Sequence, residues 1–135
     1  TETTETYTLS LHDALPIYSP AGLEHLNRRI TASFDDIFAV VGGSKKALDN
    51  ARRAKRIAEE IQIRFKRFYL AAGYDYPPER FGELSADPAF AYCGPLARDP
   101  EVARISLAGG SIFSLPDGSP FIESVRSIAR TAGYL

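Results

Sequence analysis

Residues 37–73 read IFAVVGGSKKALDNARRAKRIAEEIQIRFKRFYLAAG, and this stretch decides the fold class. It opens and closes with the short runs Ile37–Val41 and Arg67–Ala72, which are nearly continuous in apolar residues rather than alternating. Strands have this pattern when both of their faces are covered, as in a parallel sheet. Between them, apolar side chains recur every three or four positions from about Lys45 to Gln62, which predicts a helix with one buried face. We expect that face to consist of Ala47, Leu48, Ala51, Ala54, Ile57, Ala58 and Ile61. The stretch therefore predicts one βαβ unit.

The residues that follow continue the same pattern. Phe90–Gly94 is a third apolar run and predicts a third strand. Asp99 followed by Pro100 predicts the start of a helix, which is expected to be short because Gly109 and Gly110 follow. The chain is therefore predicted to be α/β, with a parallel sheet and flanking helices.

Two serines are predicted to begin helices. Ser44 stands where the N-cap of the long helix is expected, and Ser119, followed by Pro120, stands before a last helix that is expected to reach about Thr131. We expect this last helix to bury four side chains, those of Phe121, Val125, Ile128 and Ala129.

Composition and charge restrict the class of protein. The 135 residues carry 16 Lys and Arg against 17 Asp and Glu, a net charge of −1, which favours neither nucleic acid nor a membrane as the partner. No apolar run approaches the length of a bilayer span, and Cys93 is the only cysteine, so no internal disulfide can form. We expect a cytoplasmic protein in which Cys93 is a buried, unreactive thiol.

Residues 1–17 stand apart from this pattern. TLSLHDALPI at positions 8–17 resembles the translation of a short-read sequencing adapter, and TTETYT at positions 3–8 resembles, with a mismatch, the frame just upstream of it. We expect residues 1–17 to be an artefact outside the fold and residues 18–135 to belong to one domain. The alternative is a genuine N-terminal segment without regular structure.

Glycines mark the positions where a ligand is expected. Ligands of open parallel sheets bind beyond the carboxyl ends of the strands, and the predicted strands here run into Gly42–Gly43, Gly73 and Gly94 at those ends. Glycine lets a backbone approach a ligand closely, but it also simply makes turns, so both interpretations stay open. Asp35 and Asp36 lie at the opposite edge, and their pairing is not evidence of acid–base chemistry.

A second possible ligand site lies at Ser19–Gly22, which reads SPAG and enters a helical pattern. The free N–H groups at such a helix start can hold an anion such as phosphate. An ordinary helix start explains the same short motif equally well.

The order of these segments resembles one family of ATPases. SPAGLEHLNRR at 19–29, SKKALDNARRAKRIAEEI at 44–61, KRFYLAAG at 66–73, GPLARDPEVARISLAGGSIF at 94–113 and SPFIESVRSIA at 119–129 are collinear with the C-terminal half of the MinD, ParA and nitrogenase-iron-protein class of P-loop ATPases. Within that class the chain is most similar to the CooC-like nickel-insertion ATPases that mature carbon monoxide dehydrogenase. The similarity covers essentially all of residues 18–135 and implies the C-terminal half of a P-loop NTPase fold, a partial three-layer α/β structure.

The resemblance implies where the phosphates would lie. SPAG is similar to the family's switch II segment D-S-P-A-G, so Ser19, Ala21 and Gly22 are implied to lie near the γ-phosphate. Tyr18 stands in place of the aspartate. It lies at the junction with the adapter-like segment, where one adapter-derived nucleotide would convert an Asp codon into a Tyr codon.

The resemblance also implies where the base would lie. Pro95 and Leu96 match, with one extra residue, the loop that packs on the nucleotide base. Gly73 and Tyr74 stand where relatives carry Asn-Lys, with the Asn contacting the base. Glycine has no side chain to read adenine, so the chain departs from the family at this position.

The family implies ATP with Mg²⁺ as cofactor, nickel as a possible second one, a homodimer and a metalloenzyme client. The balanced charge, not the family, predicts that neither nucleic acid nor a membrane is a partner. This chain has no G-x-x-x-x-G-K-[ST] loop and no Cys-x-Cys pair, so we expect a fragment that does not hydrolyse ATP and binds no nucleotide tightly. Without the strand that carries the phosphate loop, Ile37–Val41 or its neighbour is expected to present an unpaired apolar edge. The alternative is a non-catalytic α/β module, a degenerate paralogue that binds a nucleotide weakly or docks on a partner, and Gly42, Gly43 and Gly73 favour it.

Overall fold

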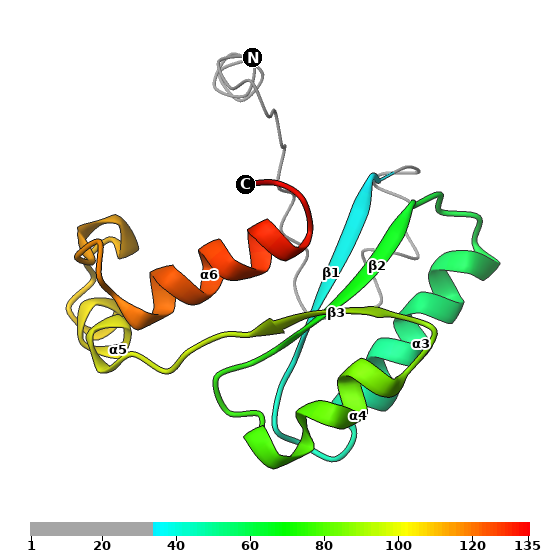
Figure 1. Ribbon diagram of the computed structural model, residues 1–135, viewed down its shortest axis with the longest axis horizontal. Coiled ribbons are helices and arrows are strands. Elements are labelled where there is room, and N and C mark those ends of the chain that lie inside the picture. The colour runs from blue at the N-terminus through cyan, green and yellow to red at the C-terminus, as the bar shows by residue number, and fades with distance from the viewer. Residues whose placement is uncertain (1–33) are drawn as a thin grey trace.

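A computed structural model describes residues 34–135. They form a three-stranded parallel sheet in the order β1-β2-β3 with helices on both faces, which confirms the predicted fold class (Figure 1). The elements follow one another along the chain as β1 (Asp36–Val41), α3 (Ala47–Glu60), β2 (Arg67–Ala72), η1 (Pro78–Arg80), α4 (Phe81–Ala86), β3 (Ala91–Pro95), α5 (Pro100–Leu107), η2 (Ile112–Ser114) and α6 (Pro120–Thr131).

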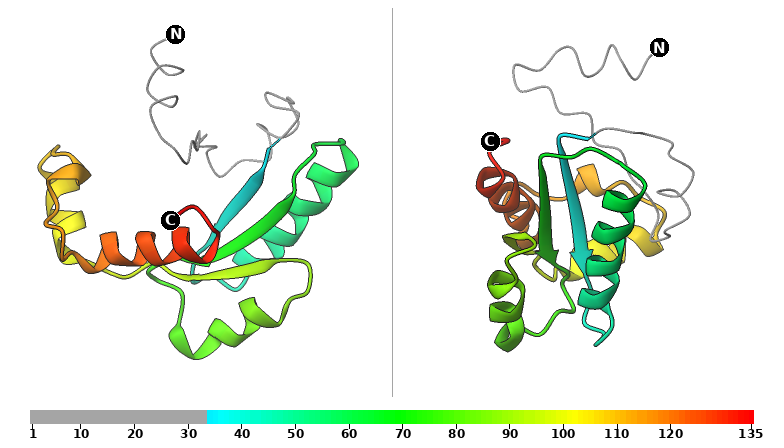
Figure 2. Two further views of the ribbon diagram at one scale, coloured as in Figure 1. Left: turned by 45° about the horizontal axis from the view of Figure 1, so that its top comes forward. Right: turned by 90° about the vertical axis from the view of Figure 1, so that its right-hand side faces the viewer.

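The central strand β2 divides the core into two layers. Leu70 and Ala72 face a cluster to which α3 and α4 contribute Leu48, Ala51 and Leu84. Tyr69 and Ala71 face the opposite way, toward Cys93 and the end of α6. Figure 2 shows α3 and α6 on opposite sides of the sheet. Both faces of β2 are therefore covered, which explains why its sequence does not alternate between apolar and polar residues.

The three predicted strands are confirmed to within one residue, and the long helix is two residues shorter at each end than predicted. The prediction that Ser44 is its N-cap is wrong. Residues 44–47 form a separate turn in which the Ala47 N–H donates to the Ser44 carbonyl at 3.1 Å. The helix therefore begins only after Lys46, without a side-chain cap. On its apolar face Leu48, Ala51 and Ala58 are buried, and the remaining predicted positions are half-buried.

The predicted starts of α5 and α6 are confirmed. Asp99 caps α5 by accepting from the Glu101 N–H at 3.0 Å, and Ser119 caps α6 by accepting from the Ile122 N–H at 3.4 Å. The prediction that α6 buries four side chains is wrong, because Val125 is 41% exposed and Phe121, Ile128 and Ala129 are only half-buried. Only the C-terminal part of α6 packs on the sheet, through Ile128, and its first turns extend beyond β3 (Figure 1).

Strand β1 lies at one end of the sheet that residues 34–135 form, and the predicted unpaired edge stays a prediction. Within the described sheet it pairs only with β2, and its side chains Phe38 and Val40 are 41% and 62% exposed. Residues 1–33, including the segment 1–17 and the motif Ser19–Gly22, lie outside the described part of the chain.

Candidate functional site

The loops that follow the three strands meet at one edge of the sheet, which we call the carboxyl edge. They comprise residues 42–46, 73–77 and 96–99. Backbone bonds hold these loops side by side, because the Gly73 N–H donates to the Val41 carbonyl at 2.8 Å and the Leu96 N–H donates to the Ala72 carbonyl at 2.7 Å. The fold therefore brings together the glycine positions that the sequence predicts as a ligand site.

Close packing around Asp75 explains two of these glycines. The Gly43 N–H donates to the Asp75 carboxylate at 3.1 Å. A Cβ atom on Gly43 would lie 2.5 Å from the Asp75 carbonyl oxygen, and one on Gly73 would lie 3.1 Å from Asp75 Oδ1 and 3.2 Å from the Val41 carbonyl oxygen. A side chain at position 43 would therefore collide with the loop after β2, and one at position 73 would displace its neighbours by a few tenths of an ångström. The packing of the loop after β1 against the loop after β2 explains Gly43 and favours Gly73, whether or not a ligand binds.

Backbone conformation explains a third glycine. The pairing of β2 with β3 shifts between Leu70 and Ala71, so that Cys93 has no partner residue in β2 and Gly94 lies opposite Ala71. Gly94 has a φ of +117°, a region that residues with a Cβ rarely adopt. Gly94 therefore marks a bulge, which sets the direction in which the next loop leaves the sheet.

An aromatic ring and a guanidinium meet at the carboxyl edge. Tyr74 is 60% exposed, and the Arg98 guanidinium carbon lies 5.2 Å from the centre of its ring. Within residues 34–135, Arg98 forms none of the ion pairs that neutralise several other arginines. The edge thus presents a flat, positively charged pair of side chains to solvent.

The loop that carries Arg98 is held in place by α5 and α6. The Ala97 N–H donates to the Ser124 hydroxyl at 3.0 Å, and this hydroxyl donates onward to the Phe121 carbonyl at 2.6 Å. Asp99 accepts from the Ser119 hydroxyl, and this bond, with the one from the Glu101 N–H, holds the pKa of Asp99 below its usual value. The backbone on both sides of Arg98 is therefore fixed.

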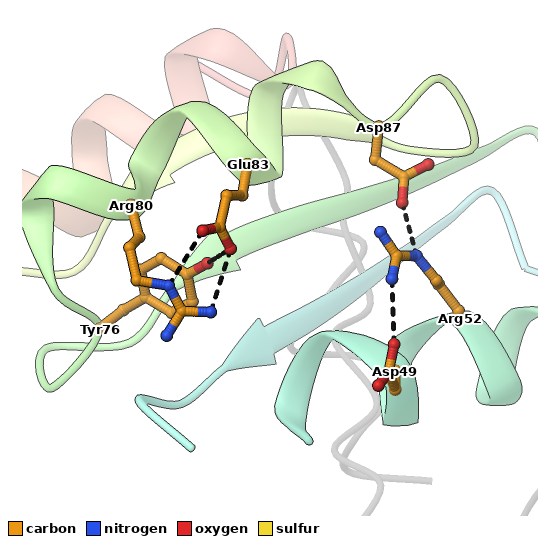
Figure 3. A network of polar contacts seen from close by, with 6 residues as sticks. All are labelled: Asp49, Arg52, Tyr76, Arg80, Glu83 and Asp87. Carbon is orange, nitrogen blue, oxygen red and sulfur yellow. Dashed lines mark hydrogen bonds and ion pairs between the residues drawn. The ribbon is translucent and has the colours of Figure 1, made fainter. Parts of the chain in front are cut away.

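The loop that carries Tyr74 is held by the start of α4. Tyr76 is buried, and its hydroxyl lies 3.5 Å from the Glu83 carboxylate, which also accepts two bonds from Arg80 at 3.0 and 3.1 Å (Figure 3). The bonds from Arg80 lower the pKa of Glu83, while burial and the neighbouring carboxylate raise the pKa of Tyr76.

A second polar contact joins α3 to the end of α4. Arg52 of α3 donates to Asp87 at 2.8 Å and to Asp49 at 3.0 Å (Figure 3).

The opposite edge of the sheet, the amino edge, is closed by Asp36. Its carboxylate accepts two bonds from Arg67, at 3.0 and 2.9 Å, and one from the Tyr134 hydroxyl at 2.6 Å. Burial alone would raise the pKa of Asp36, but these bonds outweigh it and the pKa lies below its usual value. The bond to Asp36 raises the pKa of Tyr134 to about 12. Asp36 thus ties the C-terminal residues to the sheet.

The cysteine has no reactive character. Cys93 is 3% exposed, its thiol donates to the Leu70 carbonyl at 3.1 Å, and burial raises its pKa to about 11. A thiol with such a pKa is protonated at neutral pH, and in that state it is neither a nucleophile nor a ready metal ligand.

In the part of the chain that the structure describes, no group of three or more His, Cys, Asp or Glu side chains could hold a metal ion. None of the described helices is long and apolar enough to cross a membrane.

Three of the predicted site residues lie together at the carboxyl edge. Gly73 and Leu96 follow β2 and β3, and Pro95 ends β3. The other three, Ser19, Ala21 and Gly22, lie outside the described residues. Sequence reasoning missed Asp75 and the Tyr74–Arg98 pair. Their common signal, polar or aromatic residues just after an apolar run, was present but not specific.

Together, the fold and this edge define the class of protein, an α/β protein with a parallel sheet and helices on both faces, consistent with part of a P-loop NTPase fold. The chain is 30% identical over 120 residues to the "Uncharacterized ATP-binding protein MJ0685" of Methanocaldococcus jannaschii, a match that covers 87% of this chain and 47% of that relative. The chain thus spans about half the length of the relative it matches. No family model and no solved structure matches it.

Proposed function

We propose that this chain is part of an ATP-binding protein and that its carboxyl edge forms the base side of the ATP site. The single observation that carries the proposal is the 30% identity, over most of the chain, to a relative that is named as ATP-binding. The position of the glycine-rich loops at the carboxyl ends of parallel strands supports it, because open α/β sheets bind ligands there.

In this proposal the base lies against Pro95 and Leu96, close to the backbone at Gly73. Pro95 is exposed and Leu96 half-buried, so both offer apolar surface to a planar ring. The phosphates lie toward Ser19, Ala21 and Gly22, with Mg²⁺ bound to them. Since the chain contains no phosphate-binding Gly-rich loop with its lysine, it holds the nucleotide weakly by itself and does not hydrolyse it.

A more specific proposal rests on the resemblance of the collinear segments to the MinD and CooC ATPases. The longer protein is a cytoplasmic ATPase of the MinD and CooC type that forms a homodimer and helps to insert nickel into carbon monoxide dehydrogenase. Residues 34–135 do not fit a nickel centre, because they contain no cluster of metal ligands and Cys93 is buried as a neutral thiol. The proposal therefore gives these residues no part in binding nickel.

A second candidate is a non-catalytic module that docks on a partner. One observation favours it, namely that Gly43, Gly73 and Asp75 pack directly against one another, so these glycines need no ligand to explain them. In this case the carboxyl edge would bind no nucleotide.

Titration of the ¹⁵N-labelled chain with Mg-ATP, followed by amide chemical shifts, tests the proposal. We expect saturable shifts at Gly73 and Leu96 with a dissociation constant of about 1–10 mM. Leu96→Ala should weaken binding, whereas Leu107→Ala, at an exposed leucine at the end of α5, should leave it unchanged. If the amide chemical shifts of the carboxyl edge do not change when ATP is added, the docking module is favoured.

The coding sequence upstream of Ser19 gives an independent test. A phosphate-binding loop encoded there in the same frame would support the ATPase, and a start codon beside residue 18 would contradict it.

A further inference from the structure

The carboxyl edge offers little with which to read a base by hydrogen bonds. Discrimination between adenine and guanine requires side-chain donors and acceptors aimed at the edge of the base, such as an amide that bonds to two adenine nitrogens. Gly73 has no side chain, and Asp75 Oδ1 and the Val41 carbonyl oxygen lie where one would begin, at 3.1 and 3.2 Å. The end of β2 therefore offers no side chain to read a base, and a larger residue there would have to displace Asp75 and Val41 by a few tenths of an ångström.

Asp75 itself is committed to the fold. Its carboxylate accepts the Gly43 N–H at 3.1 Å, and its backbone oxygen lies only 2.5 Å from where the Cβ of any other residue at position 43 would lie. This bond fixes the Asp75 side chain over the loop after β1. It is therefore oriented by that loop and not by a ligand.

The same edge is well equipped for stacking. Tyr74 presents an exposed ring, and Arg98 holds a planar guanidinium 5.2 Å from its centre. Bases stack on aromatic rings and on guanidinium groups whatever their hydrogen-bonding edge, because each base has a π-face. The hydrogen bonds of Ala97 and Asp99 hold the loop from which the Arg98 side chain extends.

The charge of the edge fits a triphosphate. Lys45 and Lys46 follow β1, Arg98 follows β3, and none of the three forms an ion pair within residues 34–135. The loops after the three strands contain two carboxylates, Asp75 and Asp99, and both are hydrogen-bonded within the protein. A ligand with several negative charges and a flat ring therefore complements the carboxyl edge.

We propose that Tyr74 and Arg98 form a stacking platform that binds the base of a purine nucleoside triphosphate without distinguishing adenine from guanine. This inference rests on the proposed nucleotide site and specifies its ligand class. Purines bind better than pyrimidines there because their larger rings cover more of the platform.

The test uses the full chain and measures dissociation constants for Mg-ATP, Mg-GTP and Mg-CTP from amide chemical shifts. We expect the ATP and GTP constants to agree within about threefold, with CTP several-fold weaker. Tyr74→Leu, which removes the ring at an exposed position, should weaken ATP and GTP alike by about tenfold. Arg98→Gln should weaken both in parallel, while Arg53→Gln, a matched change at an exposed position on α3, should change neither.

The outcomes separate this inference from the proposed function. Binding of ATP more than about tenfold tighter than GTP would show that the base is read by hydrogen bonds and would overturn the platform. The same conclusion follows if ATP binds to Tyr74→Leu as it does to the unaltered chain. If none of the three nucleotides binds, the nucleotide site itself is wrong, and the platform falls with it.

Discussion

The two edges of the sheet are built in opposite ways. At the amino edge a single carboxylate, that of Asp36, is almost fully buried and takes three bonds from Arg67 and Tyr134. At the carboxyl edge the loops approach one another through glycines, and the Tyr74 ring and the Arg98 guanidinium face solvent. At the amino edge Asp36, Arg67 and Tyr134 are bonded to one another, whereas at the carboxyl edge Asp75 and Asp99 are bonded within the fold and Tyr74 and Arg98 remain exposed.

This difference shows where a ligand can be bound at little cost. Groups already bonded within the protein must lose those bonds before they contact a ligand, which costs free energy. Exposed groups that make no such bonds have none to break, and binding costs them only the entropy of ordering their side chains. The ion-paired amino edge is therefore structural, although it is richer in charge contacts than the edge that we propose binds nucleotides.

The largest expected effect comes from filling the space at Gly43. In Gly43→Ala the new methyl group would lie 2.5 Å from the Asp75 carbonyl oxygen, so the loop after β2 must shift. We expect a loss of about 2 kcal/mol in the free energy of unfolding, measured in urea. Gly82→Ala in α4 is the control, since a methyl group there meets nothing within 4 Å, and it should be neutral or slightly stabilising. Equal stabilities of the two variants would show that the loops do not pack in this way.

A smaller loss is expected when the amino edge is opened with Asp36→Asn. The amide keeps the shape of the side chain but removes the charge that Arg67 and Tyr134 hold, and Arg67 is 53% exposed, so solvent screens part of the interaction. We expect a loss of about 1–2 kcal/mol at pH 7.

The effect of Asp36→Asn depends on pH in a defined direction. The pKa of Asp36 is lowered in the folded protein, so the contribution of its charge is complete above the unfolded pKa of about 3.9 and is lost as the pH falls through the folded value. The stabilities of the two proteins should therefore converge below about pH 4. If the difference in the free energy of unfolding between the unaltered chain and Asp36→Asn stays constant from pH 7 to pH 3, the charge of Asp36 does not stabilise the fold.

Local patterns in the sequence predict most of the fold. The strands are apolar runs, and the caps at Asp99 and Ser119 need only neighbouring residues, so both are found without knowledge of the tertiary structure. The short helix α4 was missed because six residues, one of them Gly82, carry too little periodicity. Its start is held by the Glu83 carboxylate, which bonds to Arg80 three residues earlier and to Tyr76 seven residues earlier, contacts that the apolar periodicity does not show. Val125 was misplaced because periodicity identifies the apolar face of a helix and not the length of it that is covered.

The candidate site was predicted only in part, for a related reason. Gly73 and the Pro95–Leu96 pair are found from the sequence because they directly follow apolar runs. The meeting of Tyr74 with Arg98 depends on the register of β2 against β3 and on the bulge at Cys93, which no local pattern encodes. The tie between Asp75 and Gly43 likewise joins loops that are far apart in sequence.

The smallest expected effect on stability is the one that best distinguishes the carboxyl edge from the amino edge. Arg98→Gln removes an exposed guanidinium whose one described partner is the Tyr74 ring, so the free energy of unfolding should fall by no more than about 0.5 kcal/mol. The matched change at the other edge, Arg67→Gln, removes both bonds to buried Asp36 and should cost clearly more. Urea unfolding of the two variants beside the unaltered chain, with equal m values as the check on two-state behaviour, measures the difference. If Arg98→Gln cost as much as Arg67→Gln, the carboxyl edge would also be a structural closure, and a loss of nucleotide binding in that variant would no longer point to a stacking platform.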